Sequence, residues 1–464
     1  MNHWNKVAKN IDRWSKGGKG YHQRLNQIFQ FHIPPNQKVL EIGCGQGDLL
    51  ASLKPKIGFG VDFSSEMIKR GRERYPELNF IEVAASEINI DDTFDYIILS
   101  DLVNDLWDVQ KVIEKIVPLS NPKTRILINF YSHLWQPFFY LASKFDLIVP
   151  HLDQNWLTVE DIKNLLVLGD LEPLSHHAEI LWPFPPKFLA NIFNRWLVKL
   201  WPFKYFAITN FVIARPSPDP MVKEPKPSVS VIIAARNEAG NILQIFERVP
   251  MMGSETEIVF VEGHSKDDTF NIIKEQIAAH PERKAKLLQQ TGEGKGDAVR
   301  LGFAEASGDI VMILDADLTV PPEDLPRFYN SLVQGKGDFI NGVRLIYPQE
   351  DEAMRFLNLL GNKFFSLIFS WLLDQPIKDT LCGTKVLWKE DYDRIAANRS
   401  YFGEFDPFGD FDLLFNAAKL GYKIIDMPIR YRERTYGDTN IDRWRHGAML
   451  LRMVIFAATR IKFI

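Results

Sequence analysis

The sequence predicts an α/β protein of two domains, in which strands and helices alternate along both halves of the chain. Three observations predict this fold class. Short apolar runs typical of buried strands alternate with helical patterns throughout the 464 residues. A proline-rich, charged stretch at residues 216–227 separates the halves and cannot join a sheet. The halves are not copies of each other, so residues 1–215 and 228–464 are expected to be different domains.

The composition narrows the class of protein. A formal charge of -4 and a pI near 6.2 argue against a nucleic-acid binder, which usually carries a strongly basic domain. Cys44 and Cys382 are far apart and have no metal-binding spacing, which fits a reducing compartment. The N-terminus lacks the apolar core of a signal peptide, and no uncharged apolar run reaches the roughly 18 residues of a membrane span. We therefore expect a cytoplasmic protein.

The sequence pattern of the first half predicts a doubly wound sheet. Apolar runs end in polar residues and are followed by helical patterns at residues 48–53 and 63–75, which implies parallel strands with ligands at their carboxyl ends. The predicted strands are residues 38–42, 58–62, 94–100, 125–129 and 207–214.

A glycine-rich turn follows the first of these strands. Glycine allows a tight backbone turn beneath a ligand that Cβ atoms would push away. An acidic residue about 20 positions further on, Asp62, is placed to accept hydrogen bonds from ribose hydroxyls. Taken alone, this pattern could equally indicate a nicotinamide cofactor. The glycines are Gly43, Gly45 and Gly47.

Two motifs carry a resemblance that separates these cases. Residues 39–47, Val-Leu-Glu-Ile-Gly-Cys-Gly-Gln-Gly, and the strand at 94–100 resemble motifs of class I S-adenosylmethionine-dependent methyltransferases. The resemblance implies a Rossmann-like sheet with S-adenosylmethionine over the glycine turn, Asp62 at the ribose, and Glu41 and Ser100 in the cofactor site. Residues 130–210 depart from the minimal fold and are rich in Trp, Phe and Pro. They could form an acceptor lid, an interfacial patch or packing against the second half.

The second half contains a strand that ends in two carboxylates. The apolar residues 310–314 lead into Asp315-Ala316-Asp317, which can present a divalent cation to the diphosphate of a nucleotide-sugar. The alternative interpretation is an ordinary turn at the end of the strand, with both aspartates solvated. The sequence context of the two aspartates favours the metal site. A Gly-Lys-Gly turn precedes them, and further strand and helix patterns surround them.

Four ordered motifs across residues 227–445 are similar to those of family 2 glycosyltransferases of GT-A fold, and most of all to the dolichyl- and polyprenyl-phosphate sugar transferases. The resemblance implies a nucleotide-sugar donor and Mg²⁺ or Mn²⁺. Asp317 would hold the metal, and Asp315 would face the ribose and sugar and share in metal binding. The implied donor-binding residues are Ala235, Asn237, Glu238, Glu262, Lys295 and Asp315.

The same resemblance implies two possible acceptors. Three arginines match positions that bind an acceptor phosphate in these enzymes, namely Arg344, Arg355 and Arg434. Arginine suits this role because its guanidinium can bind two phosphate oxygens at once. Asp410 and Asp412 match the place where hydroxyl-directed relatives carry their catalytic acid. A lipid phosphate needs no general base, whereas a hydroxyl acceptor does, so both interpretations remain open with the phosphate preferred.

The sequence as a whole predicts a bifunctional enzyme. One half would transfer methyl groups and the other would transfer sugar to a lipid-linked or glycan acceptor at the inner membrane face. Residues 364–373 and 449–464 suit helices in the headgroup region, or equally helices that face a core or a second subunit of an oligomer. The alternative function is a glycosyltransferase whose first half binds S-adenosylmethionine as a non-catalytic regulatory domain.

Overall fold

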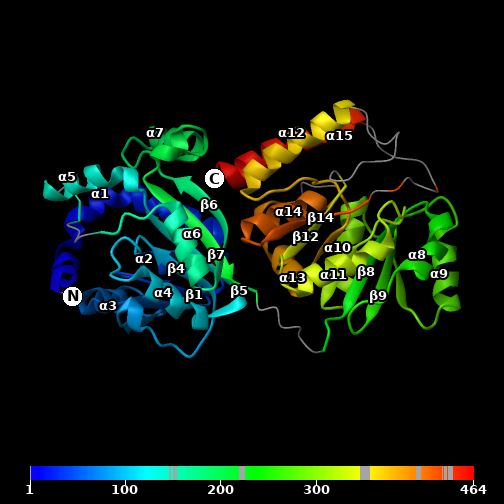
Figure 1. The fold of residues 1–464 in the computed structure, drawn as a ribbon, viewed down its shortest axis with the longest axis horizontal. Coiled ribbons are helices and arrows are strands. Elements are labelled where there is room, and N and C mark those ends of the chain that lie inside the picture. Colours follow the sequence, from blue (N-terminus) through cyan, green and yellow to red (C-terminus); the bar gives the residue numbers. More distant parts are fainter. Residues whose placement is uncertain are drawn as a thin grey trace. The chain divides into compact units, whose positions relative to one another are not determined.

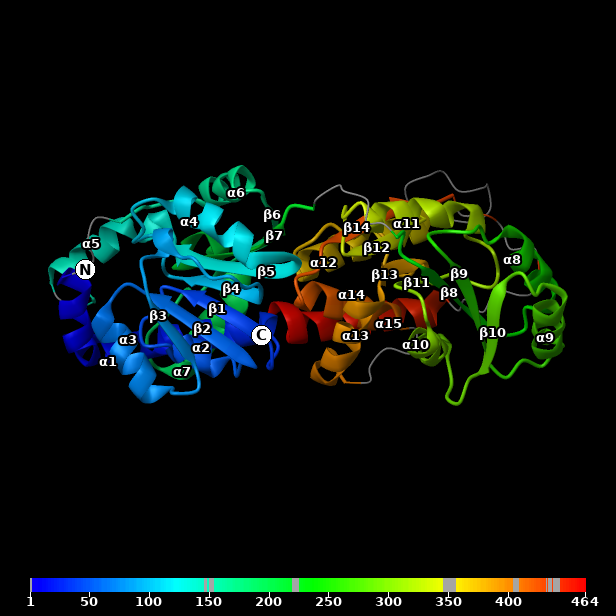
Figure 2. The same ribbon diagram turned by 90° about the horizontal axis from the view of Figure 1, so that it is seen from below.

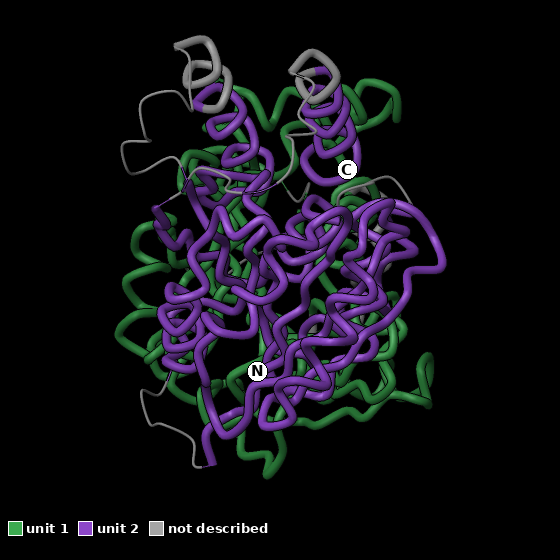
Figure 3. Tube along the Cα trace, turned by 90° about the vertical axis from the view of Figure 1, so that its right-hand side faces the viewer, with its two compact units in different colours: residues 1–217, 463–464 green, residues 218–462 purple. Residues whose placement is uncertain are grey.

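The computed structural model describes residues 2–145, 148–149, 154–218, 225–344, 356–403, 409–430, 432, 436 and 443–464. The chain forms two compact units (Figure 3). Unit 1 comprises residues 1–217 with 463–464, and unit 2 comprises residues 218–462. Each unit contains one seven-stranded sheet.

The sheet of unit 1 has the strand order β3-β2-β1-β4-β5-β7-β6. The strands from β3 to β5 are parallel, so their carboxyl ends meet at one edge, whereas β7 is antiparallel to both β5 and β6. The strands are β1 (Lys38–Ile42), β2 (Ile57–Asp62), β3 (Asn79–Glu82), β4 (Phe94–Ser100), β5 (Ser120–Tyr131), β6 (Leu171–Glu179) and β7 (Thr209–Pro216).

Helices cover both faces of this sheet (Figures 1 and 2). One apolar cluster joins the sheet to α4 and α6, and the other joins it to α1, α2 and α3. These cores are dominated by fully buried Ile, Leu, Val and Phe, which accounts for the continuous apolar runs of the parallel strands. The helices are α1 (Asn2–His32), α2 (Asp48–Ser52), α3 (Ser65–Arg74), α4 (Val109–Ile116), α5 (Gln136–Lys144), α6 (Val159–Leu168) and α7 (Lys187–Asn191).

The sheet of unit 2 has the order β10-β9-β8-β11-β13-β12-β14. The strands β10, β9, β8 and β11 are parallel, and β13 is antiparallel to its neighbours β11 and β12. The strands are β8 (Val229–Ala235), β9 (Thr256–Glu262), β10 (Lys284–Gln289), β11 (Ile310–Ile313), β12 (Phe339–Val343), β13 (Lys385–Trp388) and β14 (Ile424–Pro428).

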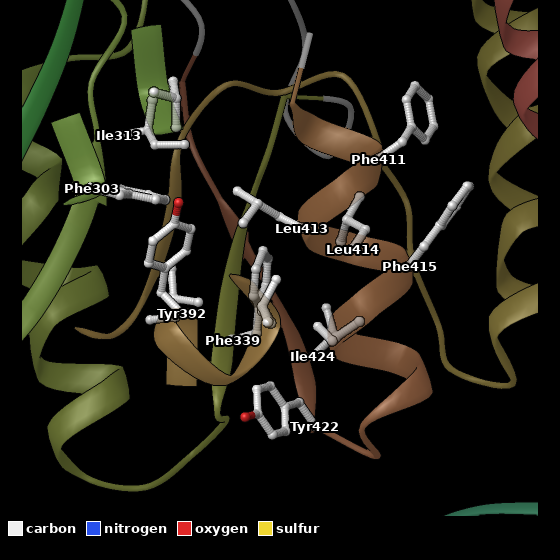
Figure 4. Packing of buried hydrophobic residues seen from close by; sticks show 14 of the residues in the cluster. Phe303, Ile313, Phe339, Tyr392, Phe411, Leu413, Leu414, Phe415, Tyr422 and Ile424 are labelled. Carbon is white, nitrogen blue, oxygen red and sulfur yellow. The ribbon is translucent and has the colours of Figure 1, made fainter. Parts of the chain in front are cut away.

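One face of this sheet carries a large aromatic core. Phe411 and Phe415 project from one helix (Figure 4), and both pack against Phe369, with ring centroids 5.4 and 6.1 Å apart. Phe364 and Leu367, on the same helix as Phe369, are instead exposed. The helices are α8 (Ile242–Arg248), α9 (Thr269–Ala279), α10 (Lys295–Glu305), α11 (Leu325–Val333), α12 (Phe356–Leu373), α13 (Lys389–Asn398), α14 (Asp410–Lys419) and α15 (Arg443–Ala457).

The predicted fold class is confirmed, because both units are α/β with mixed sheets. The first predicted strand and β1 have the same bounds, 38–42. Two segments were expected to lie in a headgroup region or to face a core. In the structure, α12 and α15 each bury some residues in the core and expose others, and contact with headgroups stays a prediction. Among the described residues, no helix is long and apolar enough to cross a membrane.

The aromatic core yields a stability prediction. Phe415→Ala removes a fully buried ring and leaves a cavity, so it should destabilise unit 2 by about 3–5 kcal/mol. Urea unfolding followed by circular dichroism measures the change. The matched control is Phe364→Ala, because Phe364 is 55% exposed and should shift the midpoint little. Equal effects of the two substitutions would contradict this packing.

Candidate active sites

The glycine turn of unit 1 links β1 to α2 at the carboxyl edge of the sheet. Gly43, Gly45 and Gly47 have φ angles of 75°, 52° and 80°, which side chains rarely allow. A Cβ at Gly45 would meet nothing within 4 Å, so this position borders open space. At Gly43 and Gly47 a Cβ would instead strike Leu102 and Phe80. The turn therefore has its open side at Gly45, where a ligand can approach the backbone.

Two acidic side chains hold this turn in place, the buried Glu41 and the half-buried Asp62. The Oε2 atom of Glu41 accepts a hydrogen bond from the Leu50 amide of α2 at 3.1 Å, and burial raises the pKa of Glu41 to about 8. Asp62, at the end of β2, accepts from the amides of Gly45 at 3.0 Å and Ser64 at 2.9 Å. Burial also raises the pKa of Asp62. Each carboxylate oxygen has room for a second hydrogen bond, so Asp62 can still receive ribose hydroxyls.

A polar cluster beside this turn escaped the sequence analysis. Ser100 ends β4, and the next residue, Asp101, has a φ of 50° that strains a residue with a side chain. Asp101 Oδ1 accepts hydrogen bonds from the Tyr21 hydroxyl at 2.8 Å and from Asn129 Nδ2 at 2.5 Å. Tyr21 belongs to α1 and Asn129 to β5, so residues far apart in the chain meet at one sheet edge. The sequence feature that could have identified this cluster was the position of Asp101 directly after a predicted strand.

In unit 2, the loops that follow β8 and β9 hydrogen-bond to each other at the carboxyl edge of the sheet. Ala235 ends β8, and its carbonyl accepts from the Gly263 amide at 3.0 Å. Asn237, with a φ of 57°, accepts from the Lys266 amide at 2.7 Å. The buried Glu262 accepts from the Ser265 amide at 2.5 Å. Three of the six predicted donor-binding residues, Ala235, Asn237 and Glu262, therefore share one loop cluster.

Glu238 has a structural partner in the same cluster. Its Oε2 atom accepts a hydrogen bond from Asn241 at 2.8 Å, and its backbone amide donates to the hydroxyl of Thr269, at the start of α9, at 2.9 Å. The side chain is buried. These contacts fix the turn between β8 and α8.

The carboxylate pair after β11 meets a lysine. Lys295 Nζ lies 2.5 Å from Asp315 Oδ1. Burial alone would raise the pKa of Asp315, but the Lys295 ammonium outweighs it and holds the pKa below the usual range. Asp317 Oδ1 accepts from both the amide and the hydroxyl of Thr319, at 3.1 and 2.8 Å. Asp315 is therefore ionised, and Asp317 is held by its own turn.

Arg344, at the end of β12, is held by a carboxylate that the sequence analysis did not single out. Its Nε and Nη2 atoms donate to Asp379 Oδ2 and Oδ1 at 2.8 and 2.9 Å, and its backbone amide donates to Oδ2 at 3.1 Å. Burial of Asp379 opposes its charge, but the arginine prevails and lowers the pKa of Asp379. This bidentate pair fixes the direction of the guanidinium.

The two candidate catalytic acids have different surroundings. Asp410 lies 3.7 Å from Lys385 Nζ, and the charges of Asp315 and Asp410 raise the pKa of Lys295 against the effect of burial. Asp410 therefore belongs to the same charged group as Asp315. Asp412 Oδ2 instead accepts from Arg399 at 2.8 Å. Its Oδ1 atom accepts from an asparagine one helical turn later at 3.0 Å.

Residues 379–385, called the central loop below, join these parts. Asp379 holds Arg344, Lys385 reaches Asp410, and a Cβ on Gly383 would collide with both members of the Lys295–Asp315 pair. In the sequence, the only indication of the central loop was a small residue, Gly383, in a polar run before β13. Arg355 and Arg434, which we predicted to bind the acceptor phosphate, lie outside the described residues.

The described residues contain no cluster of three or more His, Cys, Asp or Glu side chains that could hold a metal ion. Asp315 and Asp317 nevertheless fit a particular kind of metal site. Mg²⁺ commonly binds one or two protein carboxylates together with substrate phosphates, and keeps several waters. Two aspartate side chains at the edge of a sheet can supply the protein's share of such a site.

Comparison with known families matches each unit separately. The model of the methyltransferase domain matches residues 33–166, and the model of glycosyl transferase family 2 matches residues 230–395. The first range contains the glycine turn and Asp62. The second contains Asp315, Asp317 and the central loop.

The similar curated proteins are sugar transferases. The Dolichol-phosphate mannosyltransferase of Pyrococcus furiosus is 31% identical over 219 residues, which are 46% of this chain and 59% of that protein. The Dolichyl-phosphate hexose transferase of Haloferax volcanii is 28% identical over 232 residues, 49% of this chain and 92% of that protein. The Undecaprenyl-phosphate 4-deoxy-4-formamido-L-arabinose transferase of Edwardsiella ictaluri is 34% identical over 227 residues, 48% of this chain and 64% of that protein. The chain thus spans about 60% of the length of the first and third.

Among solved structures, a SAM-dependent methyltransferase of Thermotoga maritima, described as a possible histamine N-methyltransferase, has a TM-score of 0.37 and 12% identity. It covers 46% of this chain and 98% of its own. The family models and the geometry of the two sheet edges lead to one conclusion. The chain joins a segment that matches the methyltransferase domain, residues 33–166, to a segment that matches glycosyl transferase family 2, residues 230–395.

Proposed function

We propose that the chain is a bifunctional enzyme, with a methyltransferase domain at residues 1–215 and a glycosyltransferase domain at 228–464. The second domain would transfer a sugar from a nucleotide-sugar to a polyprenyl phosphate, with help from a divalent cation. The observation that carries this proposal is the central loop, which ties Asp315 to Arg344. A donor-side carboxylate and a phosphate-binding cation are thereby held in one charged group.

The donor would lie along the ends of β8, β9 and β11. Asn237, Glu238 and Glu262 form the loop cluster expected at the nucleoside, and Lys295 with Asp315 would face the diphosphate and sugar. Asp315 and Asp317 would hold Mg²⁺ or Mn²⁺ against the donor phosphates. When bound, the cation would stabilise the negative charge that develops on the leaving nucleoside diphosphate.

The acceptor phosphate would be oriented by Arg344. A lipid phosphate is already ionised near pH 7, so it can attack the anomeric carbon without a general base. The protein then contributes chiefly by positioning and by stabilising charge. Asp379 supports this role, because its bidentate contact fixes the guanidinium before the acceptor arrives. The relatives from Pyrococcus and Haloferax, both named for dolichol-linked acceptors, favour the same acceptor class.

A hydroxyl acceptor is the second candidate. The buried Asp410 beside Lys385 favours it, because this carboxylate joins the same charged group as Asp315 and could accept a proton. Asp412 supports it less, since Arg399 and an asparagine of its own helix engage both carboxylate oxygens. Arg344 leaves the phosphate acceptor preferred.

The first domain would bind S-adenosylmethionine over the open side of the turn at Gly45, with Asp62 at the ribose and Ser100 nearby. Transfer of its methyl group to the lipid-linked product is the preferred role, and S-adenosylmethionine binding without transfer is the alternative. Peripheral contact with the inner membrane face is supported by Phe364 and Leu367 on α12 and by Ile455 on α15, which are all exposed.

The deciding experiment incubates the full chain with Mn²⁺, polyprenyl-phosphate vesicles and a panel of radiolabelled nucleotide-sugars. Label in the organic phase identifies both the donor and a lipid acceptor. Nucleotide release without organic-phase label moves the acceptor to a hydroxyl, and the Asp410→Asn variant then tests the base. No reaction with any donor contradicts the proposal.

Removing the metal-binding carboxylate should abolish sugar transfer. Asp317→Ala is expected to lower kcat/KM by about 100-fold or more, because the leaving diphosphate loses its counter-charge. Chelation of the metal should have a similar effect on the unmodified enzyme and little further effect on the variant. The matched control is Asp393→Ala, which removes an exposed aspartate that pairs with Lys389. Full activity of Asp317→Ala would rule out this metal role.

Loss of the carboxylate that holds Arg344 should weaken the acceptor more than the donor. For Asp379→Asn we expect KM for polyprenyl phosphate to rise about 10-fold or more, because a neutral amide cannot make the same bidentate ion pair. KM for the nucleotide-sugar should change less. The comparison variant Arg344→Ala should show the same pattern. A rise confined to the donor KM would place Arg344 on the donor instead.

The cofactor site of the first domain can be tested without knowledge of the methyl acceptor. Asp62→Ala removes the proposed ribose partner and the contact with the Gly45 amide, so S-adenosylmethionine affinity should fall about 10- to 100-fold by calorimetry. The control Asp92→Ala, on an exposed loop before β4, should bind normally. Undiminished binding by Asp62→Ala would contradict this assignment. Binding by the unmodified chain without any methylated product would favour the regulatory alternative.

A further inference from the structure

Exposed aromatic side chains concentrate in one stretch of unit 1 that the proposed chemistry does not use. Residues 180–206, called the aromatic segment below, connect β6 to β7 and include α7 (Figure 1). Soluble proteins rarely gather so many large apolar side chains at the surface without a partner. Those exposed here are Trp182, Phe184, Phe188, Ile192, Trp196, Leu200, Trp201, Phe203, Tyr205 and Phe206.

The aromatic segment is a built part of unit 1. The buried Asn194 accepts hydrogen bonds from the amides of Leu181 and Trp182 at 2.8 and 2.6 Å and donates to the Trp182 carbonyl at 2.6 Å. The Pro183 carbonyl packs against α1 so closely that a Cβ at Gly20 would lie 2.5 Å from it. These contacts fix the backbone of the aromatic segment in unit 1, and the exposed rings project from this fixed backbone.

The charge of the aromatic segment indicates what covers it. The segment contains Lys187, Arg195, Lys199 and Lys204 but no Asp or Glu, although the whole chain has a net charge of -4. Lys199 is buried and pairs with Glu179, so it belongs to the fixed part of the segment. The other three cations are exposed beside the rings. A surface that is both aromatic and positive is complementary to anionic lipid headgroups over an apolar layer.

We propose that the aromatic segment is a lipid-docking surface that seats the methyltransferase unit on an anionic bilayer. Trp and Tyr rings favour the level of the headgroups, where an apolar body and a polar tip are both satisfied. Lysine and arginine side chains extend toward the phosphates from the same surface. This surface lies in unit 1 and is distinct from the exposed faces of α12 and α15 in unit 2.

A dye on the segment tests the contact directly. Cys44 and Cys382 are buried, so a cysteine introduced as Phe188→Cys can be labelled selectively with an environment-sensitive fluorophore. We expect a blue shift and increased intensity with vesicles of phosphatidylglycerol and phosphatidylcholine, and much less with phosphatidylcholine alone. The control is Trp107→Cys, because Trp107 is fully exposed on a loop outside the segment. The dye at position 107 should not respond.

Vesicle sedimentation of the full chain separates the two contributions. Phe188→Ser with Trp201→Ser should reduce binding to anionic vesicles at least 10-fold, with Trp107→Ser as the matched control. Lys187→Glu with Lys204→Glu should reduce it by more than about 25-fold, since each surface cation contributes about five-fold and the introduced carboxylates add repulsion. The matched control is the exposed Lys111→Glu. These substitutions change exposed residues, and unchanged thermal unfolding checks that the variants fold.

Three results would overturn the proposal. A dye response that depends on protein concentration and needs no vesicles would identify a second copy of the chain as the partner. Normal binding by the aromatic variant, with loss of binding in Leu367→Ser, would assign all lipid contact to α12. Absence of a dye response to any vesicle would exclude lipid as the partner. None of these measurements requires sugar transfer, so they stand or fall separately from the proposed activity.

Discussion

The architecture of the candidate glycosyltransferase site depends on one fully buried ammonium group. Lys385 begins β13 with no exposed surface, and an unpaired charge at such a place would cost several kcal/mol. Its Nζ atom donates to Asn341 at 3.0 Å and to the Cys382 carbonyl at 2.6 Å, and lies 3.7 Å from Asp410. These partners come from β12, the central loop and α14. Satisfying one lysine therefore aligns three elements around the strand end that carries Asp315.

Close backbone approaches complete the same arrangement. Gly409, with a φ of 80°, precedes Asp410, and a Cβ there would lie 2.9 Å from the Cα atom of Gly296 near the start of α10. Lys295 is the neighbour of Gly296, so this contact brings the lysine and Asp410 into one charged group. Unit 1 uses the same device at smaller scale, where Glu41 is buried and ties β1 to α2. Both units thus use a buried polar side chain to shape a loop at the carboxyl edge of a sheet.

The sequence predicted those parts of the fold that depend on local pattern. Continuous apolar runs identified β1 and β4, because parallel strands are buried on both faces. The long helix α1 was not foreseen, since its glycines and lysines give a weak helical pattern. At the sites, strand-end motifs placed Asp62 and Asp315, whose neighbours in the chain are distinctive. Asp379 and Tyr21 could not be found in this way, because their partners Arg344 and Asp101 are 35 and 80 residues away.

The charges of the candidate glycosyltransferase site favour the divalent cation that we propose. Among the described residues, the carboxylates of Asp315, Asp379 and Asp410 face the cations of Lys295, Arg344 and Lys385, so these six charges cancel. Asp317 adds a further negative charge. A nucleotide-sugar brings its diphosphate and a lipid acceptor brings another phosphate, so the loaded site would be strongly anionic. Such a site is unfavourable at low dielectric unless positive charge enters with the substrates. A divalent cation held by Asp315 and Asp317, as proposed above, would supply that charge near the place where the leaving group develops its own.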